Sequence, residues 1–325
     1  MTILITGGLG YTGIQLAKYL KVLNYDIIIV DLNLYRTKEL LGENSRTKIL
    51  VQDIRSVDWA LLKKYHVDTV YHLAGISNDP GNGVTVKTGR QINFEASARL
   101  YDAALKYGVR KFIYPSSCSV YGDSQVSTVS EETTVSPLTE YALCKVLVEN
   151  HIKTHKSERM QSIILRPATV FGPSARQRLD LLINKIIVSS LAGQGIVLPG
   201  KNKIRPSVYI NDLVQIYLNC LAFNTGSATF NVAFGNRTIA ETITLLSSHL
   251  DIDWQKIVFS ESDSRSYRVS SEKLLKQFPT FKKTSTENAF AETINYFSDS
   301  SIDKKMNSDI FYDGRVQAST WGYQQ

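Results

Sequence analysis

The stretch that decides the fold is Ile3-Leu4-Ile5-Thr6-Gly7-Gly8-Leu9-Gly10-Tyr11-Thr12-Gly13. Its apolar start predicts a buried strand, and Gly8, Gly10 and Gly13 then fit the spacing G-x-G-x-x-G at the opening of a helix. Glycines at this spacing allow a tight turn, close approach of the backbone to a pyrophosphate, and close packing of the helix on the strand. Because the first N–H groups of a helix attract phosphate, the stretch predicts a dinucleotide-binding turn.

An acidic residue ends the second apolar run, Asp26–Asp31, about where a ribose-binding carboxylate follows such a turn. Asp31 is suited to accept hydrogen bonds from a ribose 2′-OH and to repel a 2′-phosphate, which favours NAD over NADP. Arg36 follows closely and offers the alternative, a contact to a 2′-phosphate. Asp53 ends the third apolar run, either within reach of an adenine or as an ordinary helix-capping residue.

Strands and helices alternate through the first half of the chain. After Asp26–Asp31, strands are expected at Lys48–Asp53, Thr69–Ala74, Lys111–Ser116 and Gln161–Arg166. Helices are expected at Gly13–Leu23, Trp59–Tyr65, Asn93–Tyr107 and Thr139–His155. Several of the strands are apolar without alternation, as in a parallel sheet that is buried on both faces. The sequence therefore predicts an α/β fold with a Rossmann-type, doubly wound parallel sheet.

The rhythm of the sequence changes after Gly172-Pro173. Helices are expected at Leu179–Leu191, Asp212–Phe223 and Ile239–Leu250, and strands at Pro206–Ile210 and Phe230–Ala233. We expect an NAD-binding domain from residues 1–171 together with about 207–235, and a smaller C-terminal α/β substrate lobe from about 172–206 and 236–325. The polar segment 298–325 has no readable pattern.

Composition bounds the class of protein. The chain has 325 residues, 43% of them hydrophobic and 21% charged, which is an ordinary balance for a folded domain. The net charge of +7 comes from scattered basic residues, so an anionic ligand is expected and nucleic acid is not. No apolar run is long enough to span a bilayer, and three cysteines without a spacing motif fit a reduced compartment. We expect a cytoplasmic protein without a membrane segment.

Tyr141 and Lys145 stand four residues apart in a predicted helix and therefore share one of its faces. A nearby ammonium stabilises a phenolate and lowers the pKa of the phenol, so this tyrosine can exchange a proton with an alcohol. A serine cluster, Ser116–Ser119, follows the fifth strand. Because the carboxyl ends of parallel strands line the ligand crevice, this cluster is placed to supply a hydroxyl beside the phenol.

At this point the chain resembles an extended short-chain dehydrogenase/reductase of the nucleotide-sugar epimerase and dehydratase group. The matching segments are Thr6–Gly13, Asp31, Asp53, His72–Gly75, Asn93, Ser116–Gly122, Tyr141 with Lys145, Arg166–Pro173 and Arg205–Leu213. The resemblance implies that Tyr141 is the acid/base, that Lys145 supports it and that Ser117 orients the substrate oxygen. It also implies a nucleotide-diphosphate sugar as substrate and a homodimer built on the helices Asn93–Tyr107 and Thr139–His155.

The resemblance implies two further sets of residues. The cofactor set is Gly7, Gly10, Tyr11, Thr12, Gly13, Asp31, Asp53, Ile54, Leu73, Ala74, Gly75, Asn93, Ser116, Tyr141, Lys145, Pro167 and Val170. The substrate set is Ser117, Ser119, Arg176, Asn184, Arg205, Arg265 and Arg268. Within the substrate set, Arg205 is the expected diphosphate contact, because the planar fork of a guanidinium suits phosphate oxygens. The choice between Arg265 and Arg268 stays open.

Departures from the family pattern narrow the reaction. The 4,6-dehydratases of the group carry Asp-Glu after the catalytic hydroxyl, whereas this chain has Cys118 and Ser119 there, so dehydration is disfavoured. The Cys118 thiol is expected to be a buried small residue. A 4-epimerase is the leading expectation, and a 4-dehydrogenase or 4-ketoreductase needs the same catalytic residues. A non-catalytic NAD-binding regulator is the distant alternative. No metal site is expected, since the five histidines show no ligand spacing.

Overall fold

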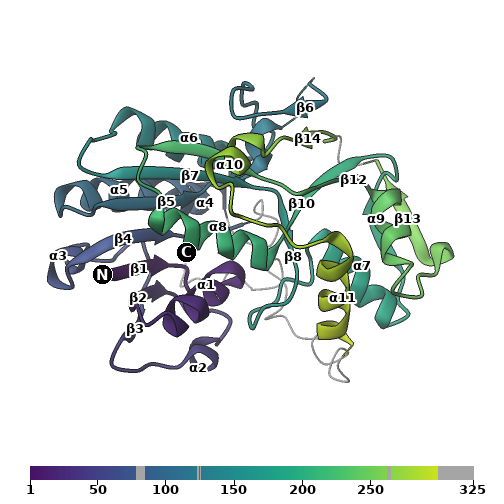
Figure 1. Ribbon diagram of the computed structural model, residues 1–325, viewed down its shortest axis with the longest axis horizontal. Coiled ribbons are helices and arrows are strands. Elements are labelled where there is room, and N and C mark those ends of the chain that lie inside the picture. The colour runs from purple at the N-terminus through teal and green to yellow at the C-terminus, as the bar shows by residue number, and fades with distance from the viewer. Residues whose placement is uncertain (78–84, 123, 125, 262–264, 299–325) are drawn as a thin grey trace.

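The computed structural model describes residues 1–77, 85–122, 124, 126–261 and 265–298, and a seven-stranded sheet forms its centre (Figure 1). The strands are β1 (Thr2–Thr6), β2 (Asp26–Asp31), β3 (Thr47–Val51), β4 (Val67–His72), β5 (Lys111–Pro115), β7 (Gln161–Pro167) and β11 (Ala228–Val232). All neighbouring strands pair in parallel, in the order β11-β7-β5-β4-β1-β2-β3. The chain winds outward from β1 in both directions, so the predicted doubly wound Rossmann-type sheet is confirmed.

Helices cover both faces of this sheet (Figure 1). Helices α1 (Tyr11–Val22) and α8 (Ile210–Ala222) pack on one face, and α5 (Ala96–Lys106) and α6 (Glu140–Thr154) pack on the other. Along β1, Ile3 and Ile5 join the first of these cores while Leu4 joins the second. Burial on both faces explains why the strands are apolar without alternation.

A buried lysine ties one of these helices to the sheet. Lys111 begins β5, and its ammonium donates hydrogen bonds to the carbonyl oxygens of Cys220, Leu221 and Phe223 at 2.8, 2.5 and 2.8 Å. These carbonyls lie at the C-terminal end of α8, where a helix has no intrahelical donors left. Lys111 thus fixes α8 at the edge of the sheet opposite to the strands' carboxyl ends.

A smaller α/β layer lies beside the sheet, at the right of Figure 1. It contains α7 (Leu182–Leu191), α9 (Ile239–Leu246), α11 (Thr286–Phe297) and the parallel pair β9 (Ile196–Pro199) and β13 (Ile257–Ser260). Its core is built around Ile187, Ile243 and Phe290. A three-stranded sheet of β8 (Thr169–Phe171), β10 (Ile204–Tyr209) and β12 (Gly235–Thr238) joins the two layers.

The remaining elements are short. Strands β6 (Thr128–Val129) and β14 (Arg268–Val269) pair in parallel. The other helices are α2 (Lys38–Leu41), α3 (Leu61–Lys64), α4 (Val86–Arg90) and α10 (Glu272–Gln277), with a π-helical turn at Gln91–Glu95 and 3₁₀ turns at Cys118–Tyr121 and Trp254–Lys256. The uninterpreted segment 298–325 lies, apart from Ser298, outside the described residues.

Four helix predictions were wrong in extent. The helix expected at Leu179–Leu191 begins only at Leu182 in α7, and the helix expected at Ile239–Leu250 ends at Leu246 in α9. The helix expected at Trp59–Tyr65 is the single turn α3, because His66 takes the left-handed backbone conformation (φ 50°) and ends it. The helix expected at Asn93–Tyr107 continues α4 through the π-helical turn, so its start lies before Asn93. A π-helical turn leaves no signal in residue periodicity and is common at functional sites.

Candidate active site

A cavity of about 670 Å³ opens at the carboxyl ends of the central strands and extends to the smaller layer. Its lining includes almost all of the predicted site residues: Gly7, Gly10, Tyr11, Thr12, Gly13, Asp31, Asp53, Ile54, Leu73, Ala74, Gly75, Ser116, Ser117, Ser119, Tyr141, Lys145, Pro167, Val170, Arg176, Arg205 and Arg265. Three candidates lie outside the lining, namely Asn93, Asn184 and Arg268. The structure therefore brings together residues that are up to 258 positions apart, from Gly7 to Arg265.

The glycine turn after β1 forms a cradle that side chains would fill. Gly7 has φ +70°, and a Cβ there would lie 2.5 Å from the backbone nitrogen of Ala74. A Cβ on Gly13 would lie 2.2 Å from the carbonyl oxygen of Gly7. The first turn of α1 contains no acidic residue, so its N–H groups present positive potential to the cavity. This cradle fits the diphosphate of a dinucleotide.

Asp31 stands at the end of β2, beside this turn. Its two carboxylate oxygens accept hydrogen bonds from the N–H groups of Leu9 and Asn33 at 3.0 and 2.8 Å. Burial raises the pKa of Asp31, and these N–H groups and the charge of Arg176 oppose the shift. Arg36 is exposed and is not part of the cavity lining. The residue that faces the ribose position is thus the carboxylate, which agrees with NAD rather than NADP.

Asp53 also borders this end of the cavity, but a neighbour engages it. The guanidinium of Arg55 contacts both carboxylate oxygens, with Nε at 3.0 and 2.9 Å. Burial acts to raise the pKa of Asp53, yet the hydrogen bonds and charge of Arg55 outweigh it and lower the pKa. Asp53 is therefore an ionised, fixed group at the rim of the site.

Ser117 is presented by a sharp turn after β5. Its Oγ accepts a hydrogen bond from the Ser119 N–H at 3.1 Å, which starts the 3₁₀ turn Cys118–Tyr121. The turn ends at Gly122, with φ +56°, where a Cβ would lie 1.6 Å from the carbonyl oxygen of Ser136. Only glycine fits there, so the Gly122 position fixes the turn that places Ser117 in the cavity.

Tyr141 and Lys145 enter the cavity from α6, as their spacing predicted. The Lys145 ammonium lies 5.6 Å from the centre of the Tyr141 ring and 4.7 Å from that of Tyr114. It donates a hydrogen bond of 2.8 Å to the carbonyl oxygen of Pro115, the last residue of β5. Burial lowers the pKa of Lys145 to about 8, while Cys144 and Glu149 act in the opposite direction. A charged ammonium is thus held beside the phenol of Tyr141 at neutral pH.

A buried ion pair holds α6 against the sheet. Arg166 of β7 donates to Glu149 of α6 through Nε and Nη2, at 2.9 and 2.6 Å. Both side chains are almost wholly buried, at 3% and 2% exposure. Burial acts to raise the pKa of Glu149, but the hydrogen bonds and charge of Arg166 lower it overall. Since Glu149 follows Lys145 by one helical turn, this pair fixes the helix that carries Tyr141 and Lys145.

A second buried network supports the loop after β4. His72 bonds the Thr6 hydroxyl through Nδ1 at 2.6 Å and the Ser97 hydroxyl through Nε2 at 2.7 Å. Burial, with the charge of Lys145, lowers the pKa of His72 to about 3, so the ring is neutral. Asn93 holds the backbone of Ile76 by both its amide oxygen and nitrogen, at 2.7 and 3.0 Å. Asn93 therefore positions a cavity-lining loop and is not itself part of the lining.

The Cys118 thiol is not suited to act as a nucleophile. Its sulfur donates to the carbonyl oxygen of Arg166 at 3.1 Å, and burial raises its pKa far above the usual range for a thiol. The residue is 3% exposed. The thiolate is the reactive form of cysteine, and Cys118 does not form it at neutral pH. Cys118 is thus the buried small residue that was expected.

On the substrate side, two arginines line the cavity together. The Arg205 guanidinium, from β10, donates to the carbonyl oxygen of Arg265. Arg268 is exposed and lies outside the lining, because β14 turns Val269 and not Arg268 toward the interior. Between the two alternatives, the structure thus places Arg265 in the cavity and Arg268 on the surface.

Asn184 was misplaced among the substrate contacts. It is completely buried, its amide oxygen accepts from the Gly172 N–H, and its nitrogen donates to Tyr11 Oη and to the Arg178 carbonyl oxygen. It fastens the loop after β8 to the start of α1. Its position in a helical apolar pattern could not distinguish this role from ligand contact.

Arg178 and Asp180 were missed by sequence reasoning, although both line the cavity. Arg178 donates to Asp180 through Nε at 2.8 Å and Nη2 at 2.5 Å, and to the Ser77 hydroxyl through Nη1 at 2.7 Å. Ser77 follows β4, and Ser117 follows the neighbouring strand β5. The only available signal was the pairing of Arg178 with Asp180 two residues later.

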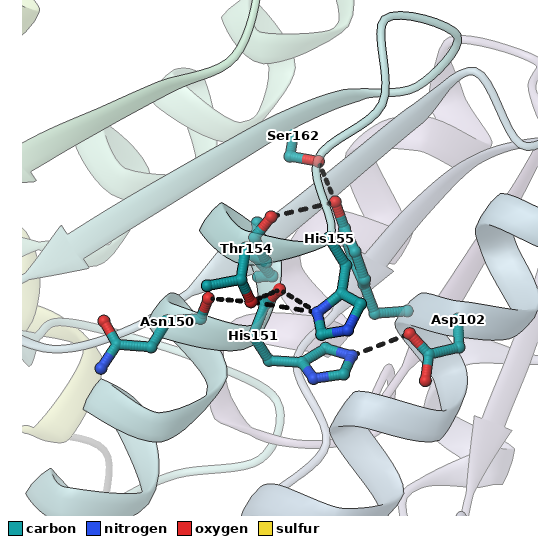
Figure 2. A network of polar contacts seen from close by, with 8 residues as sticks. Asp102, Asn150, His151, Thr154, His155 and Ser162 are labelled. Carbon is teal, nitrogen blue, oxygen red and sulfur yellow. Dashed lines mark hydrogen bonds and ion pairs between the residues drawn. The ribbon is translucent and has the colours of Figure 1, made fainter.

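His151 and His155 are not part of the cavity lining; Figure 2 shows the His151 ring turned toward Asp102 of α5. Nε2 of His151 is 2.8 Å from a carboxylate oxygen of Asp102 on α5, and the two imidazoles stack with centroids 4.2 Å apart. Nδ1 of His155 faces the His151 carbonyl oxygen and the Thr154 hydroxyl, both at 3.0 Å. In the described part of the chain, no three histidine, cysteine, aspartate or glutamate side chains are grouped so that they could hold a metal ion.

No helix of the described residues is both long enough and apolar enough to cross a lipid bilayer.

Comparison with known proteins identifies the family. A family model described as "NAD dependent epimerase/dehydratase family" matches residues 3–233. The chain is 32% identical over 230 residues to an uncharacterized UDP-glucose epimerase, YtcB, of Bacillus subtilis, covering 66% of this chain and 71% of that protein. It is 29% identical over 252 residues to a UDP-glucose 4-epimerase of Mycolicibacterium smegmatis, covering 73% and 79%.

Among solved structures, a UDP-N-acetylglucosamine 4-epimerase from Methanobrevibacter ruminantium, in complex with UDP-N-acetylmuramic acid, superimposes with a TM-score of 0.80. The identity is 26%, and the match covers 91% of this chain and 97% of that structure. The expectations of an extended short-chain dehydrogenase/reductase and of NAD as cofactor are confirmed. With its glycine cradle, its strand-end Asp31 and the matched residues 3–233, this chain belongs to the NAD dependent epimerase/dehydratase family.

Proposed function

We propose that the protein is an NAD-dependent UDP-sugar 4-epimerase. The observation that carries this proposal is one cavity in which Ser117, Tyr141 and Lys145 meet the dinucleotide cradle, and which Arg205 and Arg265 also line. The relatives that are named UDP-glucose epimerases supply the choice of UDP-sugars as the substrate class.

The reacting oxygen would lie between Tyr141 and Ser117. The Ser117 hydroxyl orients the oxygen on C4 of the sugar, and the Tyr141 phenol takes its proton and later returns it. The Lys145 ammonium stabilises the phenolate form of Tyr141 during this exchange. Bound NAD supplies the group that accepts hydride from C4 and gives it back. For inversion, the 4-keto sugar has to present its other face before it is reduced again.

Arg205 and Arg265, which both line the cavity, suit the diphosphate of the substrate. Arg205 lies on β10 of the three-stranded sheet and Arg265 precedes β14, so two segments that are 60 residues apart in the sequence meet at this position. Guanidinium groups bind phosphate oxygens through pairs of parallel hydrogen bonds. Anchoring at the diphosphate leaves the sugar free to rotate, which the inversion at C4 requires.

Dehydration receives no support from the residues at the reacting centre. Cys118 and Ser119 follow Ser117, and neither carries a carboxylate. A 4-dehydrogenase or 4-ketoreductase would use the same three catalytic residues and is the alternative that the assay below separates. A non-catalytic NAD-binding regulator is disfavoured because Tyr141 and Lys145 are both present and both line the cavity.

We also propose a cytoplasmic homodimer that pairs through α5 and α6. We further propose a cofactor domain of residues 1–171 with about 207–235, because α8 and β11 pack on the main sheet, and a substrate lobe formed by the rest. Light scattering at micromolar concentration tests the dimer. A monomeric mass would contradict it.

The reaction is tested by incubating the purified protein with a panel of UDP-, GDP-, dTDP- and CDP-sugars, with NAD added. Proton NMR identifies the sugar, and absorbance follows NADH. We expect a new C4 epimer of a UDP-sugar without net NADH. Stoichiometric NADH together with a 4-keto product would make the enzyme a dehydrogenase instead.

A further inference from the structure

Arg176 lies on the cofactor side of the cavity, although it belongs to the loop that leads into the smaller layer. Its Cζ is 3.7 Å from the centre of the Tyr35 ring, and Tyr35 follows β2. It is also close enough to Asp31 for its charge to act on that carboxylate. The residue is 2% exposed, and all three residues line the cavity. A buried guanidinium thus meets the ribose-binding end of the site from the opposite wall.

The loop that carries Arg176 is fastened to the phosphate-binding helix. Tyr11 Oη donates to the Gly172 carbonyl oxygen at 2.7 Å, and the Ser174 hydroxyl donates to the Tyr11 carbonyl oxygen at 2.7 Å. Gln15 Nε2, one turn along α1, donates to the Pro173 carbonyl oxygen at 3.0 Å. These contacts hold the loop directly above the start of α1, which fixes the path of Arg176 toward Tyr35.

We propose that Arg176 and Tyr35 form a clasp across the adenosine half of the NAD site, so that release of the cofactor requires this contact to open. The guanidinium lies over the face of the phenol ring. Its in-plane N–H groups, of which Nη1 donates to the Gln177 carbonyl oxygen, supply the donors for the ribose and diphosphate of the cofactor. Arg176 then acts on the cofactor, and the diphosphate of the sugar substrate is left to Arg205 and Arg265.

The clasp predicts a specific change in cofactor release. In Arg176→Gln the rate constant for NAD dissociation should rise about tenfold or more, which corresponds to the strength of a buried cation–π contact. Tyr35→Leu, which removes the ring, should raise it similarly, whereas Tyr35→Phe, which keeps the ring face, should change it little. Stopped-flow fluorescence with excess competitor measures this rate on the full-length protein without any sugar turnover.

Arg178→Gln is the matched control, because it removes a second buried arginine from the same loop. Arg178 donates hydrogen bonds to Ser77 and Asp180. We expect NAD dissociation to accelerate much less in Arg178→Gln than in Arg176→Gln. An equal rise in both arginine variants would overturn the clasp and indicate a loosened loop. An unchanged rate in Arg176→Gln would also overturn it. Since NAD release is read without substrate, either result leaves the epimerase proposal to its own assay.

Discussion

Glu149 of α6 and Arg166 of β7 form a buried, two-pronged ion pair that joins the helix of Tyr141 and Lys145 to the sheet, with donor–acceptor distances of 2.9 and 2.6 Å. Arg166 also donates to Tyr121 Oη at 2.9 Å, which ties the turn after Ser117 to the same network. One pair of charges therefore fixes both elements that supply the proposed catalytic groups. Its contribution is to position Tyr141, Lys145 and Ser117, since neither partner lines the cavity.

Replacing only one partner of the Glu149–Arg166 pair should strongly reduce the stability of the fold. Arg166→Met leaves the Glu149 carboxylate buried without its main partner, and we expect a loss of about 3–5 kcal/mol in the free energy of unfolding. The double variant Arg166→Met/Glu149→Leu should recover most of that loss, because no unpaired charge remains. Urea denaturation of the three proteins measures both effects. Equal stability of the single variant and the parent would show that the pair contributes nothing.

Tyr141→Phe removes only the proton-transfer group. We expect turnover to fall by about 10²–10⁴-fold, the usual contribution of a positioned acid/base, while the affinity for NAD stays near that of the parent. Calorimetric titration with NAD, beside the epimerase assay, separates the two quantities. Full activity in this variant would show that another group moves the proton.

Lys145 predicts a limit on activity at alkaline pH. Because burial lowers its pKa from 10.5 to about 8, its positive charge is present below about pH 8 and is lost above it. Activity should therefore decline as the pH rises through about 8. Lys145→Met should be inactive across the range, while any activity that remains in Lys145→Arg should lack this decline, since arginine stays charged. An unaltered alkaline limb in Lys145→Arg would assign the titration to a different group.

The glycine cradle can be tested with a pair of substitutions. Gly13→Ala would place a Cβ 2.2 Å from the Gly7 carbonyl oxygen, so the turn has to shift and NAD affinity should fall at least about tenfold. Gly89→Ala is the control, because nothing lies within 4 Å of a Cβ there and alanine favours the helix α4. Calorimetry with NAD distinguishes them. Parent-like NAD binding by Gly13→Ala would contradict the assigned cradle.

The sheet and the catalytic helix could be predicted because local patterns determine them. A strand buried on both faces is an apolar run, and the spacing of Tyr141 and Lys145 fixes their common face regardless of the rest of the chain. The short strands β6, β8, β9 and β12–β14 could not be predicted, since stretches of two to four residues carry no measurable periodicity. They form through tertiary pairing alone.

The substrate side was harder to predict for a related reason. Three members of the substrate set, Asn184, Arg176 and Arg268, were predicted from residue type and position in the sequence. In the structure, the contacts of each with neighbouring segments decide where its side chain points. The side-chain amide of Asn184 makes hydrogen bonds with backbone groups of Gly172 and Arg178. Arg268 faces outward from the two-residue strand β14. Arg176 lies over the Tyr35 ring because its loop, which follows β8, is hydrogen-bonded to Tyr11 at the start of α1. Contacts of this kind depend on segments that are far apart in the sequence.

The most direct test of the epimerase uses the UDP-sugar identified in the panel, with deuterium in place of hydrogen at C4. The deuterated sugar is mixed with the same sugar that has hydrogen at C4 and carries a different isotope label at another carbon. The products are analysed by NMR and mass spectrometry. The account predicts that each product keeps its own hydrogen isotope at C4, with inverted configuration, no exchange between molecules and no accumulated NADH. Deuterium that collects in NADH beside a released 4-keto sugar would contradict it.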